Sequence, residues 1–145
     1  MSERQRATGG MSQRSFPVRT LVPGRARGPV LLCTSEIPGW GGIDPRTGNI
    51  VEVGHPQRGR SVAGTVLVMP GAKGSSGWSG QLHLAQLQDK APAAIVTRRL
   101  NAKLALTLAV LRVPAVMDVP EEAYALLRDG CPATVADGAL VIHDD

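Results

Sequence analysis

The chain has 145 residues, of which 43% are hydrophobic, so it can fill the core of one domain of ordinary size. Aromatic residues make up only 3%, whereas glycine and proline are frequent, which favours short elements and tight turns over a helical bundle. The net charge of +4 comes from residues 1–28, which carry six arginines and one acid; the remainder has ten basic and eleven acidic side chains. A nearly neutral body argues against a nucleic-acid-binding surface.

The first part of the chain differs in composition from the rest. Residues 1–27 are polar, arginine-rich and without hydrophobic periodicity, so we expect a flexible basic extension there and a single domain over 28–145. The extension lacks the apolar run of a secretory signal. No stretch approaches the roughly 18 apolar residues of a membrane span. We therefore expect a cytoplasmic protein that does not associate with membranes.

Short apolar runs between residues 29 and 117 have the composition of β-strands. They predict strands over 29–34, 49–53, 64–69, 91–97 and 113–117. Because the run over 64–69 is apolar on both faces, we expect it in the centre of a sheet. The last third ends with a predicted hairpin, 133–136 and 140–142, whose turn contains Asp137 and Gly138.

Three segments have the signals of helices. The segment over 81–88 has a core-facing leucine stripe, with Ser79 as its predicted N-cap. Asn101 is the predicted cap of a second helix that runs through Leu111. A third helix begins at Pro120, has acidic residues in its first turn, and is expected to end at Gly130.

The order of these elements predicts the fold class. Strands and helices alternate in the middle of the chain, so part of the sheet should be parallel, while both ends are rich in strands. We therefore expect an α/β fold, a layered β/β/α domain with a mixed sheet or small barrel and about three helices. A doubly wound nucleotide-binding fold fits less well, because the chain lacks the GxGxxG and GxxxxGK[ST] patterns.

The loop over 70–80 has the composition of a ligand-binding loop. It follows a buried strand, precedes a helix, and places Ser75 and Ser76 between Gly74 and Gly77, with Lys73 beside them. A helix N-terminus and a glycine-rich backbone together suit a carboxylate or phosphate, or stabilise a negatively charged side chain. The spacing alone leaves two interpretations open, a solvated turn or a functional loop. A serine base would need a water-poor site, which a partner must complete.

Other catalytic and redox motifs have little support in the sequence. His55, His83 and His143 have no carboxylate at a suggestive spacing, which argues against a Ser-His-Asp triad; His55 is interpreted as a turn residue and His83 as a surface residue. The two cysteines, Cys33 and Cys131, form no CxxC pair and cannot supply the three or four thiolates of an iron–sulfur cluster. We expect neither a metal site nor a cofactor on this chain.

Five segments in one unbroken order resemble the small subunit of the aconitase X family. They are Trp40–Gly48, His55-Pro56, Ser61–Val68, Lys73–Ser76 and Ala91–Val96, and the resemblance extends over about residues 28–142. It implies the swivelling domain of aconitase, a β/β/α layered fold. It also implies a heteromeric dehydratase whose large subunit holds an iron–sulfur cluster and most of the substrate pocket.

The resemblance also implies roles for the residues of the loop. Ser75 would be the proton acceptor, and Ser76, Gly74 and Lys73 would bind a small hydroxy-acid substrate. The family usually has arginine where this chain has Lys73, and lysine keeps the charge without the bidentate geometry. Known family activities suggest cis-3-hydroxy-L-proline as the substrate, with phosphomevalonate as the alternative.

Two other classes remain as alternatives to a dehydratase subunit. One is a non-catalytic swivelling or binding domain, including the kind that carries a phosphoryl group on a loop histidine; here the loop contains serines and no histidine. The other is a nucleic-acid-binding or scaffolding protein that acts through its basic first segment.

Overall fold

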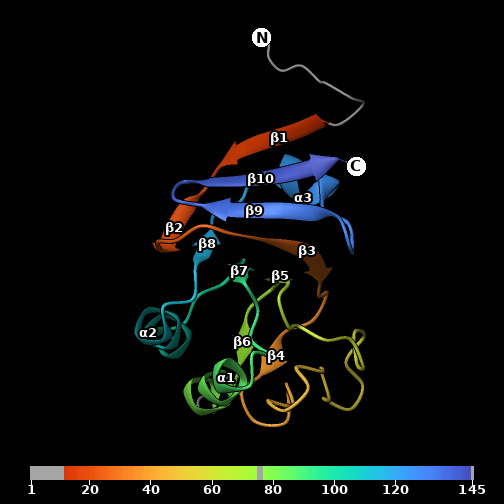
Figure 1. Ribbon diagram of the computed structural model, residues 1–145, viewed down its shortest axis with the longest axis vertical. Coiled ribbons are helices and arrows are strands. Elements are labelled where there is room, and N and C mark those ends of the chain that lie inside the picture. Colours follow the sequence, from red (N-terminus) through yellow and green to blue (C-terminus); the bar gives the residue numbers. More distant parts are fainter. Residues whose placement is uncertain (1–11, 75–76, 145) are drawn as a thin grey trace.

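The computed structural model describes residues 12–74 and 77–144, and these fold into ten strands and three helices (Figure 1). The strands of the first half are β1 (Ser12–Pro17), β2 (Arg19–Val22), β3 (Ala26–Leu32), β4 (Ile37–Pro38), β5 (Val66–Met69) and β6 (Ala72–Lys73). The remaining elements are α1 (Trp78–Leu87), β7 (Ala94–Thr97), α2 (Ala102–Leu111), β8 (Ala115–Met117), α3 (Glu121–Leu126), β9 (Pro132–Ala136) and β10 (Ala139–Asp144).

Eight strands form one mixed sheet in the order β1-β10-β9-β3-β5-β7-β8-β2. The four central strands β3, β5, β7 and β8 are parallel, and the pairs toward both edges are antiparallel. The two edge strands, β1 and β2, are separated in the chain only by Val18, so the sheet must bend until its edges meet at one corner. The backbone N–H of Val18 donates to the carbonyl of Gly138 there, at 3.1 Å.

The bent sheet gives the domain its layers. Strand β3 belongs to both halves: residues 26–29 pair with β9, and residues 30–32 pair with β5. Along β5, Val66 and Val68 pack into a core between the two halves, which α3 closes, while Leu67 and Met69 pack into a second core beneath α1 and α2. Because both faces are buried, all four residues of β5 are apolar. The predicted α/β class, with its β/β/α layers, mixed sheet and three helices, is confirmed.

The parallel strands position two loops at one edge of the sheet. Strands β5 and β7 pair in register from Val66↔Ala94 to Met69↔Thr97, so their carboxyl ends lie side by side. The segments that follow them lead into α1 and α2. Ligands in open α/β sheets bind at this edge.

The predicted flexible extension is wrong where the structure describes it. Residues 12–22 form β1 and β2, and β3 already begins at Ala26, so the domain does not start at Gly28. Strand β1 pairs with β10 over six residue pairs, and Phe16 and Val22 are buried. The apolar alternation in this segment is short and lies among arginines, which is why composition hides it. Residues 1–11 lie outside the described residues.

Three smaller predictions about elements are also wrong. Residues 49–53 form no strand: Ile50 is fully buried, but it makes only an isolated bridge to Ile43. Helix α3 ends at Leu126 rather than near Gly130, because Leu127 already has an extended backbone. The predicted cap of α1 differs as described below. The helix capped by Asn101 and the final hairpin are confirmed.

Candidate functional site

The glycine- and serine-rich loop begins as an ordered segment. After β5, residues Ala72–Lys73 form β6, which pairs in parallel with β4. Gly74 follows with a φ of 83°, a left-handed conformation that suits glycine. The predicted proton acceptor Ser75 and its neighbour Ser76 lie outside the described residues, so their roles stay predictions. The structure describes what surrounds them.

Helix α1 begins immediately after this loop and has an open N-terminus. Its N-cap is Gly77, with a φ of 95°, and no side chain caps the helix. Ser79, the predicted N-cap, lies inside the first turn, because the left-handed glycine turns the chain into the helix two residues earlier. The first hydrogen bond of the helix runs from the N–H of Gln81 to the carbonyl of Gly77. The preceding N–H groups have no partner further along the helix, and the N–H groups of a helix N-terminus are the ones that a ligand can bind.

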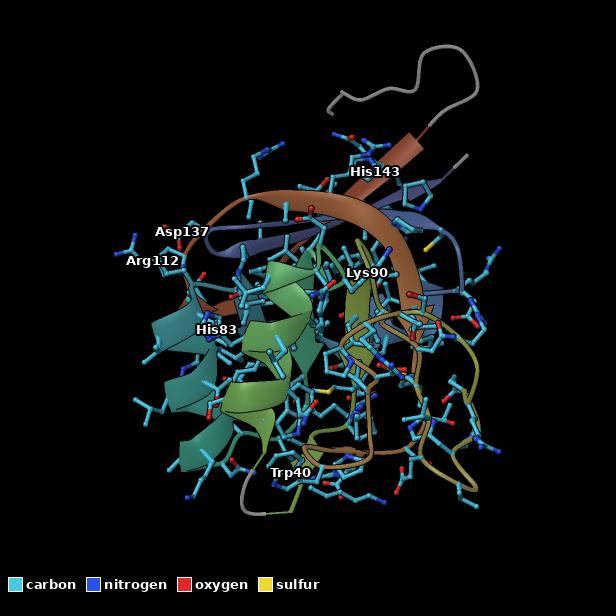
Figure 2. The ribbon with its side chains drawn as sticks, turned by 60° about the horizontal axis from the view of Figure 1, so that its bottom comes forward. Trp40, His83, Lys90, Arg112, Asp137 and His143 are labelled. Carbon is cyan, nitrogen blue, oxygen red and sulfur yellow. The ribbon has the colours of Figure 1, made fainter. Side chains whose placement is uncertain are left out.

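Two tryptophans hold the start of α1 in place. Trp78 is only 6% exposed, and its indole N–H donates to the carbonyl of Ile37 at 3.1 Å. Trp40 is 65% exposed, yet it packs against Gly77: a Cβ on that glycine would lie 2.7 Å from Cδ1 of the indole. Figure 2 places Trp40 at the end of the molecule where α1 begins. A large apolar side chain is thus both fixed and exposed beside the loop.

Lys73 has a partner that the sequence did not suggest. Its ammonium lies 2.7 Å from the carboxylate of Glu52, and the two side chains are 45% and 22% exposed. Glu52 belongs to the segment over 49–53, which the sequence predicts as a strand. That prediction gives no indication that Glu52 lies near β6. The pair brings the Lys73 charge to the loop but leaves it partly neutralised.

The loop after β7 is bonded to the loop after β5. The Asn101 side chain caps α2 by accepting from the N–H of Leu104 at 2.8 Å, and its amide donates to the carbonyl of Ala72 at 3.4 Å. Arg99 donates from its backbone to the carbonyl of Pro70, and its guanidinium pairs with Glu36 at 2.8 Å. The capping pattern predicts Asn101, whereas no sequence pattern marks Arg99 or Glu36.

The glycine-rich segment over 39–48 forms a closed turn. The carbonyl of Asp44 accepts from the N–H groups of Thr47 and Gly48, and its carboxylate accepts from the N–H of Arg46 at 2.9 Å. That last bond lowers the pKa of Asp44 below its ordinary value. Gly48 lies so close to the hydroxyl of Ser61 that a Cβ would come within 2.9 Å of it. This segment is a scaffold for Trp40.

Comparison with known proteins places the chain in a family. The family profile described as the aconitase X swivel domain matches residues 15–143. The chain belongs to the aconitase X swivel-domain family. The crystal structure of the holo-form of Thermococcus kodakaraensis aconitase X aligns with a TM-score of 0.81 and 29% identity, over 89% of this chain and 98% of that one. The resemblance expected from the five sequence segments is thereby confirmed.

Relatives of this swivel domain include dehydratases of two kinds. A phosphomevalonate dehydratase small subunit of Methanothermobacter thermautotrophicus is 35% identical over 81% of this chain and 89% of its own length. A cis-3-hydroxy-L-proline dehydratase of Pseudomonas aeruginosa is 36% identical over 88% of this chain, but the match covers only 23% of that protein. The chain is therefore a small subunit of the aconitase X dehydratase type.

The histidines of the swivel domain lie apart from one another. His55 is buried and holds its loop together: Nδ1 accepts from the N–H of Gln57, and Nε2 lies 3.2 Å from the carbonyl oxygen of Ser35. His83 is exposed on α1, and His143 lies in β10 next to Thr134. The predicted turn and surface positions of His55 and His83 are confirmed.

Cys33 lacks the surroundings of a reactive thiol. Burial raises the pKa of Cys33 to about 12, and the charge of Asp129 adds to the effect. Cys131 is half-buried, and both thiols are free. Within residues 12–74 and 77–144, no three His, Cys, Asp or Glu side chains are grouped as metal ligands, and no helix is long and apolar enough to cross a membrane.

Proposed function

We propose that this chain is the small subunit of a heteromeric hydro-lyase that dehydrates a small hydroxy acid and is active only with its large subunit. Ser75 accepts the proton next to the substrate carboxylate, and Ser76, Gly74 and Lys73 bind the substrate. The observation that carries the proposal is the uncapped N-terminus of α1, which follows the glycine-flanked serine pair at the carboxyl edge of the parallel strands.

The chemistry of a serine base explains why this position matters. A free serine hydroxyl is a very weak acid, so its alkoxide needs hydrogen-bond donors that are already in place. The N–H groups of Trp78, Ser79 and Gly80 belong to the first turn of α1, where the helix dipole favours negative charge. The left-handed backbone at Gly74 and Gly77 lets the chain approach a ligand without side-chain interference.

The proposed activity needs a second chain. An alkoxide survives only where water is excluded, and the start of α1 lies at the surface of a small domain, next to the exposed Trp40. The two cysteines of this chain do not fit an iron–sulfur cluster. Cys33 is buried in the core beneath α1 and α2, where its pKa is raised, and Cys131 packs against the other core. The cluster belongs to the large subunit, where it would supply a Lewis acid for the departing hydroxyl.

Two substrates follow from the relatives. We propose cis-3-hydroxy-L-proline first, since the Pseudomonas aeruginosa dehydratase that acts on it aligns over more of this chain than the Methanothermobacter relative does. A second candidate, phosphomevalonate, is favoured by architecture: the relatives with that activity are separate small subunits, 89% covered in the case of the Methanothermobacter protein. The hydroxyproline relative instead holds this domain within a much longer chain.

The test uses the chain co-purified with the large subunit and both substrates. Ser75→Ala should assemble normally and lose about a thousandfold in kcat, the usual contribution of a positioned proton acceptor. Ser15→Ala, on the exposed face of β1, is the matched control and should leave kcat unchanged. Ser75→Ala with near-normal kcat removes the serine from its role, and turnover by the large subunit alone would make this chain a non-catalytic swivelling domain.

A further inference from the structure

A hollow of about 120 Å³ lies between the N-terminal ends of α1 and α2. Figure 2 shows the two helices side by side, both beginning at the end of the molecule where Trp40 lies, with Arg112 at the far end of α2. Its lining includes two glycines and four residues with polar side chains: Gly74, Gly77, Ser79, Asn101, Lys103 and Thr107.

The charges around the hollow all have one sign. Both helices have ten residues, so each presents the positive end of a full dipole. Asn101 caps α2 by satisfying only the N–H of Leu104, which leaves the earlier N–H groups of that helix available. Lys103 is exposed and, among the described residues, has no acidic partner. None of the residues that line the hollow is acidic.

A buried hydroxyl on α2 is an independent indication of a ligand. Thr107 is only 4% exposed, lines the hollow, and has no hydrogen-bond partner among the described residues. Within that part of the chain, the only side-chain atom that is sealed from solvent and unpartnered is the hydroxyl of Tyr124. The Thr107 hydroxyl is therefore reached through the hollow. A hydroxyl that lines a hollow without a protein partner bonds to whatever enters that hollow.

We propose that this hollow binds an anionic oxygen group, a phosphate or a carboxylate, through the N-terminus of α1 together with Lys103, Ser79 and Thr107. The identification of this phosphate or carboxylate as part of the substrate rests on the proposed function, whereas the binding of an anion does not. The hollow adjoins Gly74 and Gly77, which flank the two serines, so a substrate held here by its anionic end would extend toward the loop. Ser79, Lys103 and Thr107 then decide how strongly the substrate is held.

The binding test uses the isolated full chain, labelled with ¹⁵N, and needs no large subunit. Inorganic phosphate and, separately, acetate are titrated at constant ionic strength while the amide signals of Trp78, Ser79 and Lys103 are followed. We expect saturable shifts, with phosphate binding more tightly than acetate because it carries more charge. Lys103→Gln should weaken phosphate binding about tenfold, whereas Lys90→Gln, at the opposite end of α1 (Figure 2), should not change it.

Two further variants separate charge from fold. Thr107→Val keeps the shape of the side chain and should weaken binding through the lost hydroxyl alone. Asn101→Asp keeps the helix cap, because aspartate caps as well as asparagine. It loses the amide bond to the carbonyl of Ala72 but places a carboxylate in the hollow, so it should abolish phosphate binding. Shifts that grow linearly with any salt, or that are equal in Lys103→Gln and Lys90→Gln, overturn the proposal. A tighter complex with acetate than with phosphate would assign the hollow to a carboxylate.

A second measurement distinguishes this inference from the proposed function. In the assembled enzyme, Lys103→Gln should raise KM about tenfold with kcat unchanged, while Ser75→Ala should lower kcat and leave phosphate binding by the isolated chain unchanged. If Ser75→Ala retains full activity but phosphate still binds, the proposed catalytic role fails and the anion site stands. If Ser75→Ala is inactive but KM is unaffected by Lys103→Gln, the catalytic role stands and the substrate site fails.

Discussion

Two glycine-rich loops meet at the same end of this domain, and they differ in where their backbone hydrogen bonds go. In the segment over 39–48, the N–H groups of Arg46, Thr47 and Gly48 all donate to Asp44, and the carbonyl of Gly48 accepts from Val62. In the segment over 70–77, β6 is paired but the helix that follows begins at Gly77 without a cap. The first loop satisfies itself, and the second, over its described residues, supplies no side-chain cap to the first turn of α1.

The difference shows how to separate a scaffold from a ligand site when composition is the same. Both loops contain several glycines, and both have left-handed residues, such as Gly48 with a φ of 79° and Gly77 with a φ of 95°. Buried or clustered backbone donors must be bonded by something, so a loop with open donors points to a ligand. The closed loop instead supplies Trp40, which braces the open one.

The largest expected effect breaks the contact between the two loops. Gly77→Ala should destabilise the domain by about 2–3 kcal/mol, because the left-handed backbone is strained for alanine and its Cβ would press on Trp40. The matched control is Gly80→Ala, in the same helix with no heavy atom within 4 Å of the added Cβ. It should stabilise by about 0.5–1 kcal/mol. Urea unfolding measures both; equal effects would show that Trp40 does not brace the loop.

An intermediate effect opens the closed loop itself. Asp44→Ala removes the acceptor for Arg46 and should destabilise the domain at neutral pH. Because the folded pKa of Asp44 lies below its unfolded value, its contribution is present above the unfolded pKa and is lost as pH falls through the folded one. The difference between Asp44→Ala and the original chain should therefore shrink below about pH 4. Unfolding curves at several pH values test this, and a constant difference would contradict it.

The smallest effect concerns the ion pair between Lys73 of the open loop and Glu52, which follows the closed loop in the chain. Lys73→Gln should cost less than about 1 kcal/mol of stability, since the Lys73 side chain is nearly half exposed and its pair with Glu52 is screened by water. Glu52→Gln is the reciprocal control and should have a similarly small effect. A double-mutant cycle gives the coupling. Because Lys73 is proposed to bind the substrate, Lys73→Gln should also raise KM in the assembled enzyme, and an unchanged KM would remove Lys73 from the substrate site.

Local signals predicted the parts of the fold that depend on local chemistry. The cap at Asn101 is predictable because an asparagine side chain accepts from the N–H three residues ahead. The Asp137–Gly138 turn is predictable because it joins two apolar runs. Ser79 was wrong as a cap because a left-handed glycine can begin a helix with no side chain at all. The β/β/α layers followed from the order of the predicted strands and helices, and the family resemblance followed from five ordered segments.

Long-range pairing accounts for what the sequence concealed. Strand β1 forms because it pairs with β10, more than a hundred residues later in the chain. No pattern within the arginine-rich segment itself predicts that strand. The same holds for Glu52, which pairs with Lys73 although the two lie in separate segments of the chain. The hollow between α1 and α2 needs both helices in place, so no pattern in either helix predicts it.

The chain contains only two tryptophans, and they report on opposite environments: Trp78 is almost fully buried, while Trp40 is 65% exposed. A polypeptide that covers the serine loop would contact the exposed indole of Trp40 but not the buried indole of Trp78. With a fluorine label on both indole rings, subunit assembly could be followed by NMR: the Trp40 resonance should shift, and the Trp78 resonance would serve as the internal standard.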